Sequence, residues 1–414
     1  PLSAWLTPEL KPFFGGTYFP PEDRHGRTGF PSLLRAIAKG WADEREKLIN
    51  ESERVIGSLR EYHSGRAASV EEGVDLVEAG GMAFEKCFQY FNESFDEQHG
   101  GFGGAPKFPR ASNLNFLFRC AAVQGVESDL GREAIKLAAI TLQKLSAGGI
   151  HDHVGGGFHR YSVDEGWFVP HFEKMLYDQA QIAGNLLDAN LATGDERFAW
   201  VARGIFEYVL RDLTHLEGGF YSAEDADSLL AHGSPDHAEG AFYGWSHGEL
   251  TELLGEDAAF FCDHFGVKVE GNVAPAHDPH GEFMLKNILR QRQSLLVTAK
   301  AYGLAPEAAA DKLAGLLLRL REVRKSRPRP HLDDKVITAW NGLMISALAR
   351  AAVTPAECLA GQLGNYKLAA VRAAEFVQRE LYDESRGVLY RNYREGRGAN
   401  EGFAEDYAYF IAGL

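Results

Sequence analysis

A short turn made of adjacent glycines and an aromatic residue recurs along this chain of 414 residues. The copies are Gly100-Gly101-Phe102, Gly155-Gly156-Gly157-Phe158, Gly218-Gly219-Phe220 and a weaker one, Gly387-Val388-Leu389-Tyr390. The first three lie roughly 55 to 65 residues apart, and self-similarity at such a period indicates a repeated supersecondary unit. We therefore expect helical hairpins that carry a Gly-rich turn at the same end, with a pocket where the turns converge.

Two sets of helical patterns alternate from about residue 76. One set comprises residues 76–94, 131–147, 195–213, 306–325 and 366–381, and all but 306–325 lead toward a Gly-rich turn. The other set follows polar loops and comprises residues 111–124, 170–192, 334–353 and 401 onward, while residues 221–290 interrupt the alternation. Because such repeats bury an apolar face only by stacking on their neighbours, the pattern predicts a mainly α fold of the α/α toroid type.

The N-terminal stretch has a different character. Residues 2–6 and residues 13–19 predict two strands of a hairpin, and a helix is expected from about Ser32 to Tyr62. A polar stretch rich in Ser, Gly and Ala follows. We therefore expect a first domain over 1–63, a linker over 64–73 and the toroid over 74–414.

Composition narrows the class of partner. The net charge is −15, which argues against nucleic acid or an anionic membrane, because both require a basic surface. No apolar run reaches the roughly 20 residues of a membrane helix. Four cysteines lie apart among apolar neighbours, so we expect free thiols in a reducing, cytoplasmic setting and no metal site: Cys87, Cys120, Cys262 and Cys358. The chain opens without a methionine and ends within an apolar helical pattern, from which we expect a fragment.

Several long motifs resemble one family. They are Lys11 through Pro21 (KPFFGGTYFPP), Trp167 through Asp178 (WFVPHFEKMLYD) and Asp333 through Ile345 (DDKVITAWNGLMI). Together they resemble the spermatogenesis-associated protein 20 family of thioredoxin-domain-containing proteins. The resemblance implies the C-terminal part of a thioredoxin-like α/β domain, then an (α/α)6 six-hairpin toroid similar to those of glycosidases and N-acylglucosamine 2-epimerases, here incomplete at the C-terminus. The Cys motif of the thioredoxin part is missing, so we expect no dithiol exchange.

The motif around Pro170 is the first candidate site. Pro170 suits the first position of a helix, which would place His171, Met175 and Asp178 on one face and Glu173 in the first turn. His171, Glu173, Tyr177 and Asp178 would then combine acid, base and aromatic groups at one helix mouth. The alternative is that Glu173 stabilises the helix start and Asp178 is a buried acceptor.

A carboxylate cluster follows the third turn. Glu224, Asp225 and Asp227 lie close together, and mutual repulsion should raise the pKa of at least one of them. Paired carboxylates are what glycoside chemistry requires. The alternative is a solvated loop whose carboxylates cap neighbouring helices.

Histidines cluster at the second turn. His151, His153 and His159 are suited to proton exchange or substrate binding, since in an epimerase-like toroid two histidines exchange a proton with a sugar carbon. The alternative is that Asp152 and these histidines hold the turn by hydrogen bonds to the backbone.

The remaining candidates are aromatic or polar residues at expected helix starts. Asp334 would open the helix bearing Trp340 and Asn341, which resemble a sugar platform and a hydroxyl partner, and Asp406 would open another helix in the same way. Trp167 is a further stacking candidate, although large aromatics are more often core.

These residues lead us to predict a carbohydrate-active protein, either a glycoside hydrolase or a sugar epimerase. The expected catalytic pair is Asp178 with Asp225 or Asp227, tuned by His171, with Trp340 as a stacking wall. We expect a carbohydrate or small-molecule ligand, no cofactor, and a protein partner only under the alternative hypothesis, a non-catalytic redox-linked binding or scaffold protein. Paired carboxylates about 5 to 9.5 Å apart would favour hydrolysis, whereas two histidines flanking a pocket would favour epimerisation.

Overall fold

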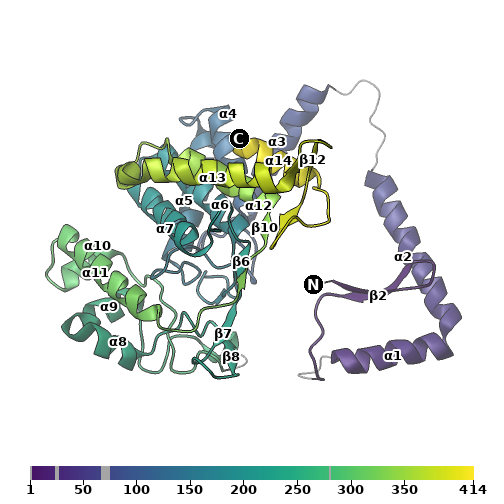
Figure 1. Ribbon diagram of the computed structural model, residues 1–414, viewed down its shortest axis with the longest axis horizontal. Helices are drawn as coiled ribbons and strands as arrows, with labels where there is room; N and C mark the ends of the chain where they lie inside the picture. The colour runs from purple at the N-terminus through teal and green to yellow at the C-terminus, as the bar shows by residue number, and fades with distance from the viewer. Residues whose placement is uncertain (1, 24–27, 67–74, 279–280) are drawn as a thin grey trace. The chain divides into compact units, whose positions relative to one another are not determined.

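The computed structural model describes residues 2–23, 28–66, 75–278 and 281–414. The chain divides into two compact units, Pro1–Phe84 and Glu85–Leu414 (Figure 1). Most of the linker expected at 64–73 lies outside the described residues, and residues 64–66 are the end of a helix.

The first unit contains the expected hairpin. Strand β1 (Ser3–Leu6) pairs antiparallel with β2 (Pro12–Gly16), with Trp5 opposite Phe14. The Trp5 ring lies 5.6 Å from the Phe14 ring and 5.8 Å from that of Phe19. Aromatic pairs of this kind stabilise strands beyond their buried area.

The single helix expected over 32–62 is instead two helices, α1 (Phe30–Asp43) and α2 (Arg45–Arg66). The chain turns at Glu44, whose N–H donates to the carbonyl of Gly40. A Cβ at Gly40 would lie 3.7 Å from the Leu48 side chain, so the two helices approach closely at this glycine. A continuous helix would have separated these two residues, whereas folding back lets α2 pack on β2.

The second unit begins in α3 (Leu76–Ser94) and is built from an inner and an outer set of helices. The inner helices are α4 (Ala111–Gln124), α6 (Leu176–Thr193), α12 (Thr338–Ala351) and α14 (Ala404–Gly413), and each packs on the next. The outer helices α5 (Asp129–Ala147), α7 (Glu196–Asp212) and α13 (Leu363–Leu381) pack on α4, α6 and α12 (Figure 1). This alternation defines an α/α toroid.

The Gly-rich turns lie where the sequence places them. Each of the first three closes a short antiparallel bridge, of which His151 with Phe158 is one example. Gly156 has φ of 81°, and a Cβ there would lie 2.3 Å from the carbonyl oxygen of Gly204 on α7. Only glycine fits, because the backbone is left-handed and a helix packs directly against it.

The fourth residue of three inner helices holds the turn that precedes the helix. On α6, the Gln179 amide accepts from Phe158 N (2.8 Å) and donates to Phe158 O (2.7 Å). On α12, the Asn341 amide makes the same pair of bonds with Phe220, at 2.8 and 3.0 Å. On α14, the Tyr407 hydroxyl accepts from Leu389 N at 2.9 Å. In these three repeats, therefore, a side chain of the inner helix fixes the turn to that helix.

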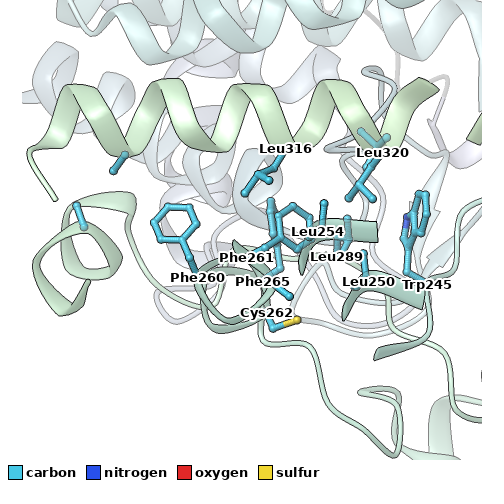
Figure 2. Close-up of a cluster of buried hydrophobic side chains, with 14 residues drawn as sticks. Trp245, Leu250, Leu254, Phe260, Phe261, Cys262, Phe265, Leu289, Leu316 and Leu320 are labelled. Carbon is cyan, nitrogen blue, oxygen red and sulfur yellow. The ribbon is translucent and has the colours of Figure 1, made fainter. Parts of the chain in front are cut away.

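The region that interrupts the alternation has its own core. Helices α8 (His247–Leu254), α9 (Ala258–Phe265), α10 (Leu295–Ala301) and α11 (Pro306–Arg324) surround an apolar cluster. In Figure 2, Leu316 and Leu320 of α11 point toward the labelled side chains beneath that helix, among them Phe261 and Trp245. The segment 306–325, expected as an outer helix of the toroid, thus packs in this satellite cluster, because its buried residues Ala309, Leu316 and Leu320 belong to it.

Candidate functional site

Three short strands precede α6 at the turn-bearing end of the toroid. They are β3 (Tyr161–Ser162), β4 (Pro170–His171), which pairs with β3, and β5 (Lys174–Met175). The helix expected to begin at Pro170 begins instead at Leu176, so the predicted helical face through His171, Met175 and Asp178 is wrong. The extended form is stabilised because neighbouring segments satisfy its backbone: the N–H of Arg160 donates to the carbonyl of Glu173 at 2.9 Å.

Side chains from 171 to 174 alternate between two environments, as in a strand. His171 and Glu173 contact each other, with His171 Nε2 lying 3.4 Å from Glu173 Oε2. Phe172 and Lys174 both pack on Tyr243, at 5.3 Å between rings and 5.1 Å from Nζ to the ring. The motif therefore serves two separate clusters, which we call the His171 cluster and the Lys174 cluster.

The His171 cluster is a chain of ionic hydrogen bonds. His171 Nδ1 lies 2.8 Å from Glu239 Oε1, and Arg160 donates to Glu173 Oε2 at 2.7 Å. Burial alone would lower the pKa of His171, but the hydrogen bonds to Glu173 and Glu239 raise it to about 9. The bond from His171, helped by Arg160 and opposed by burial, lowers the pKa of Glu173 to about 2. At neutral pH the imidazole is charged and Glu173 is ionised.

Asp178 has the opposite character. Burial raises its pKa to about 8; Arg160 opposes this rise and Glu173 adds to it. Its Oδ2 atom is buried and has no hydrogen-bond partner among the described residues. Asp178 stands in the first turn of α6, where the helix dipole favours a carboxylate, yet burial outweighs this effect. Next to it, Tyr177 meets Trp340 edge to face, with ring centroids 4.8 Å apart.

The three carboxylates that follow the third turn lie in two different environments. Asp225 and Asp227 are exposed, and Glu224 is buried at 3% exposure. Burial raises the pKa of Asp227, and the charges of Asp225 and Glu239 add to the rise, while His171 opposes it. Asp227 therefore belongs electrostatically to the His171 cluster. Glu224 instead pairs across β5 and β6 (Ala223–Glu224) with Lys174 and belongs to the other cluster.

The Lys174 cluster is built on Asp152, which the sequence placed only among the residues that hold the turn. The Asp152 carboxylate accepts two bonds from Arg324 (2.9 and 2.7 Å) and one from Lys174 Nζ (2.7 Å). Glu224 accepts from the Tyr208 hydroxyl at 2.7 Å and from Arg329 at 2.6 Å. Burial lowers the pKa of Lys174, although the charge of Asp152 opposes this effect.

The three candidate histidines lie against backbone carbonyls, with His159 buried and His151 and His153 half-buried. His151 Nδ1 lies 3.0 Å from Ser146 O, His153 Nε2 lies 2.9 Å from Gly148 O, and His159 Nδ1 lies 2.9 Å from Phe172 O. Burial lowers the pKa of His151 to about 4 and holds the pKa values of His153 and His159 well below the usual range. They are neutral at pH 7, and they hold the turn by hydrogen bonds to the backbone, which was the alternative interpretation of these histidines.

Other predicted binding residues have structural partners. Trp167 is buried, and its indole N–H donates to His99 O at 2.9 Å. Asp406 is buried and accepts from the N–H groups of Ala339 (3.0 Å) and Phe403 (2.9 Å).

Asp334 does not open α12, as predicted, because β9 (Leu332–Asp333) and β10 (Val336–Ile337) lie on either side of it and the helix begins at Thr338. Asp334 pairs with Arg394 at 2.7 Å.

Arg160 and Glu239 are the members of the His171 cluster that the sequence predictions missed. Arg160 follows the His159 position directly and is a charged residue beside a Gly-rich turn, which is a readable signal. Glu239 lies on β8 (His237–Glu239) of a hairpin with β7 (Asp227–Leu229), far along the chain from His171. No local pattern indicates that contact.

In the described part of the chain, no group of three or more His, Cys, Asp or Glu side chains has the arrangement of a metal site. None of its helices is both long and apolar enough to span a membrane. The four cysteines are free, with Cys120 and Cys262 buried.

Fold and site together define an α/α toroid protein with acid and base groups at its turn-bearing end. Residues 1–60 match a family model described as Thioredox_DsbH, protein of unknown function, DUF255. Over all of this chain, human spermatogenesis-associated protein 20 is 42% identical, and 53% of that protein is covered. The chain belongs to the spermatogenesis-associated protein 20 family, and it spans about half the length of the curated relatives it matches.

The solved structures that resemble this chain have low sequence identity to it and low TM-scores. A sugar epimerase from a ruminal bacterium is 14% identical, with a TM-score of 0.29, covering 79% of this chain and 95% of the epimerase. The unsaturated glucuronyl hydrolase from Bacillus sp. GL1 is 14% identical, with a TM-score of 0.30, covering 83% of this chain and 81% of the hydrolase. At such TM-scores no residue of either protein is matched to a residue of this chain.

Proposed function

We propose that this chain carries a carbohydrate-active acid–base site in the His171 cluster, with glycoside hydrolysis as its chemistry. The observation that carries the proposal is Asp178, a half-buried acid with a pKa of about 8 and a buried, unpartnered Oδ2 atom, close enough to Glu173 for that charge to raise its pKa. A carboxylic acid that keeps its proton at neutral pH is the donor that a glycosidic leaving group requires.

The second group of the pair is Asp227. Glu173 is a poor base because its pKa is about 2 and its carboxylate is held by His171 and Arg160. Asp227 is an exposed residue, but partial desolvation of its carboxylate and the nearby charges of Asp225 and Glu239 raise its pKa. It is therefore a stronger base than Glu173. In this mechanism Asp178 protonates the leaving oxygen and Asp227 activates water or attacks the sugar directly.

The other residues position these two. Glu239 fixes the His171 ring through Nδ1, and the charged imidazole balances Glu173 and Glu239. Tyr177 and Trp340 offer aromatic surface beside Asp178, and sugars stack on such faces. Hydrolysis is favoured over epimerisation because one ring nitrogen of each of His151, His153 and His159 is bonded to a backbone carbonyl, and the cavity that they line, of about 20 Å³, is too small for a sugar ring.

The test is turnover of an oligosaccharide library by the full-length protein, with products identified by NMR. The expected result is hydrolysis of at least one glycoside, lost in Asp178→Asn and Asp227→Asn. Asp236→Asn is the matched control, because Asp236 is exposed on the same hairpin as Asp227. The stereochemistry of the product then assigns Asp227, since retention requires a nucleophile and inversion a base.

A thermal-shift screen of the same library separates binding from catalysis. Sugars that bind without turnover, in wild type and Asp178→Asn alike, would overturn the catalytic mechanism and leave a carbohydrate-binding protein. Absence of both binding and turnover would favour the alternative hypothesis, a non-catalytic redox-linked binding or scaffold protein.

A further inference from the structure

A cavity of about 280 Å³ lies on the Lys174 side of β5, away from His171 and Glu173. Its walls come from the C-terminal ends of α7 and α11 and from the segment bearing Phe242 and Tyr243. Lys174 and Glu224, neighbours across β5 and β6, form part of its lining. The cavity is therefore separate from the proposed catalytic pair.

The lining is strongly cationic. Among the described residues around the cavity, six cations face three carboxylates; the cations are Lys174, Arg211, Arg321, Arg324, Lys325 and Arg329, and the carboxylates are Asp152, Asp212 and Glu224. This local excess of positive charge contrasts with the chain as a whole, which has a net charge of −15. A concentration of guanidinium groups around one hollow favours a planar or tetrahedral oxyanion.

Two donors at this cavity make no hydrogen bond within the described ranges. Arg321 is half-buried, and its guanidinium makes only a long ion pair there, with Glu207 at 4.0 Å. Tyr243 is 7% exposed, and its buried hydroxyl has no hydrogen-bond partner in the same part of the chain. A buried unpaired hydroxyl costs free energy and calls for an explanation.

Other lining cations are already held in place. Asp152 binds both Arg324 and Lys174, while Arg329 bridges Asp212 (2.7 Å) and Glu224 (2.6 Å). Positive charge near the ends of α7 and α11 also stabilises those helices. Helix stabilisation accounts for Lys325 and Arg211, but it does not account for the unpaired hydroxyl of Tyr243.

We propose that this cavity binds a small oxyanion, the phosphate or carboxylate group of a metabolite. Arg321 and the Tyr243 hydroxyl donate to it, and Arg324 and Lys174 supply fixed positive charge. The site is preorganised because Asp152 orients both of those cations before the ligand arrives. The volume suits one anionic group on a small molecule.

The test is isothermal titration of the full chain at constant ionic strength with inorganic phosphate and with glucuronate, and with glucose as a neutral control. Saturable binding of phosphate or glucuronate is expected, and the preferred one identifies the anionic group. Arg321→Gln should weaken binding about tenfold or more, because it removes a charged hydrogen bond. Arg319→Gln, at an exposed position of the same helix, should leave it unchanged.

Tyr243→Phe provides a second readout. This change should weaken anion binding while keeping or raising thermal stability, because it removes a hydroxyl that the protein leaves unpaired. The proposal is overturned if neither anion binds saturably, if Arg321→Gln weakens glucose binding as much as anion binding, or if Arg319→Gln weakens anion binding as much as Arg321→Gln. A loss of stability in Tyr243→Phe would also overturn it, by showing that the hydroxyl has a partner within the protein.

Discussion

Replacing Asp152 by asparagine tests whether the Lys174 cluster stabilises the toroid. The carboxylate accepts bonds from Arg324, Lys174 and the N–H groups of Val154 (3.1 Å) and Gly155 (2.9 Å). Asparagine keeps an oxygen for the two backbone donors but removes the charge. Arg324 and Lys174, exposed by only 5% and 1%, would then lie buried together without their shared counter-charge.

The expected cost follows from that loss. Breaking a buried ion pair by removing one partner costs about 3 to 5 kcal/mol. For a unit spanning Glu85–Leu414 the melting temperature falls by about 1.5 °C for each kcal/mol, so the expected decrease is about 4 to 8 °C. A further, smaller cost arises because Lys174 and Arg324 then repel each other.

The assay is equilibrium unfolding in urea at pH 7, followed by circular dichroism. Asp129→Asn is the control, because Asp129 is exposed and pairs with Arg132 at the surface, where loss of the pair costs under about 1 kcal/mol. Adding Lys174→Met to Asp152→Asn should recover part of the stability, since one stranded cation is removed. A loss below about 1 kcal/mol, or a double variant less stable than the single one, would refute the reasoning.

Three further changes have defined outcomes in the same urea assay. Asp178→Asn should stabilise the protein by several kcal/mol at pH 8 and by nothing below about pH 4. The reason is that the pKa of Asp178 is raised from 3.8 to about 8 in the folded state, so wild type loses stability as pH rises between these values. Equal stability of variant and wild type at pH 8 would contradict the assigned pKa. His151→Gln should flatten the loss of stability on going from about pH 6.5 to 4, since its folded pKa of about 4 lies below the ordinary 6.5; an unchanged pH profile would rule this out. Asn341→Leu should cost about 2 to 4 kcal/mol by leaving Phe220 N–H and C=O unpaired, and a change in ligand affinity at unchanged stability would show that Asn341 acts in binding instead.

Periodicity predicted the toroid well because long amphipathic helices and Gly-rich turns are local signals. The bounds of α3 and α4 agree with the expected 76–94 and 111–124. The starts of α6 and α12 were placed several residues too early, since the short strands before them depend on pairing with distant segments. Those pairings, such as β6 with β9, leave no periodic trace in two residues of sequence.

The grouping of residues in the His171 cluster was predicted in part. His171, Glu173 and Asp178 do share one environment, as the motif suggested, although the helical face proposed for them does not exist. Glu239 reaches His171 from a hairpin 68 residues away, and only the fold brings the two together. Charges inside an otherwise apolar stretch, such as Lys174, were the overlooked signal, because a buried lysine requires a partner.

The alternation from His171 to Lys174 also constrains how this motif can change. Neighbouring residues serve different clusters, so an insertion or deletion of one residue would exchange their faces. It would carry Lys174 toward Arg160 and Glu173 toward Asp152, placing like charges together in both clusters at once. This four-residue stretch therefore couples the His171 cluster to the Lys174 cluster. We expect it to tolerate substitutions that keep its length, but no insertion or deletion.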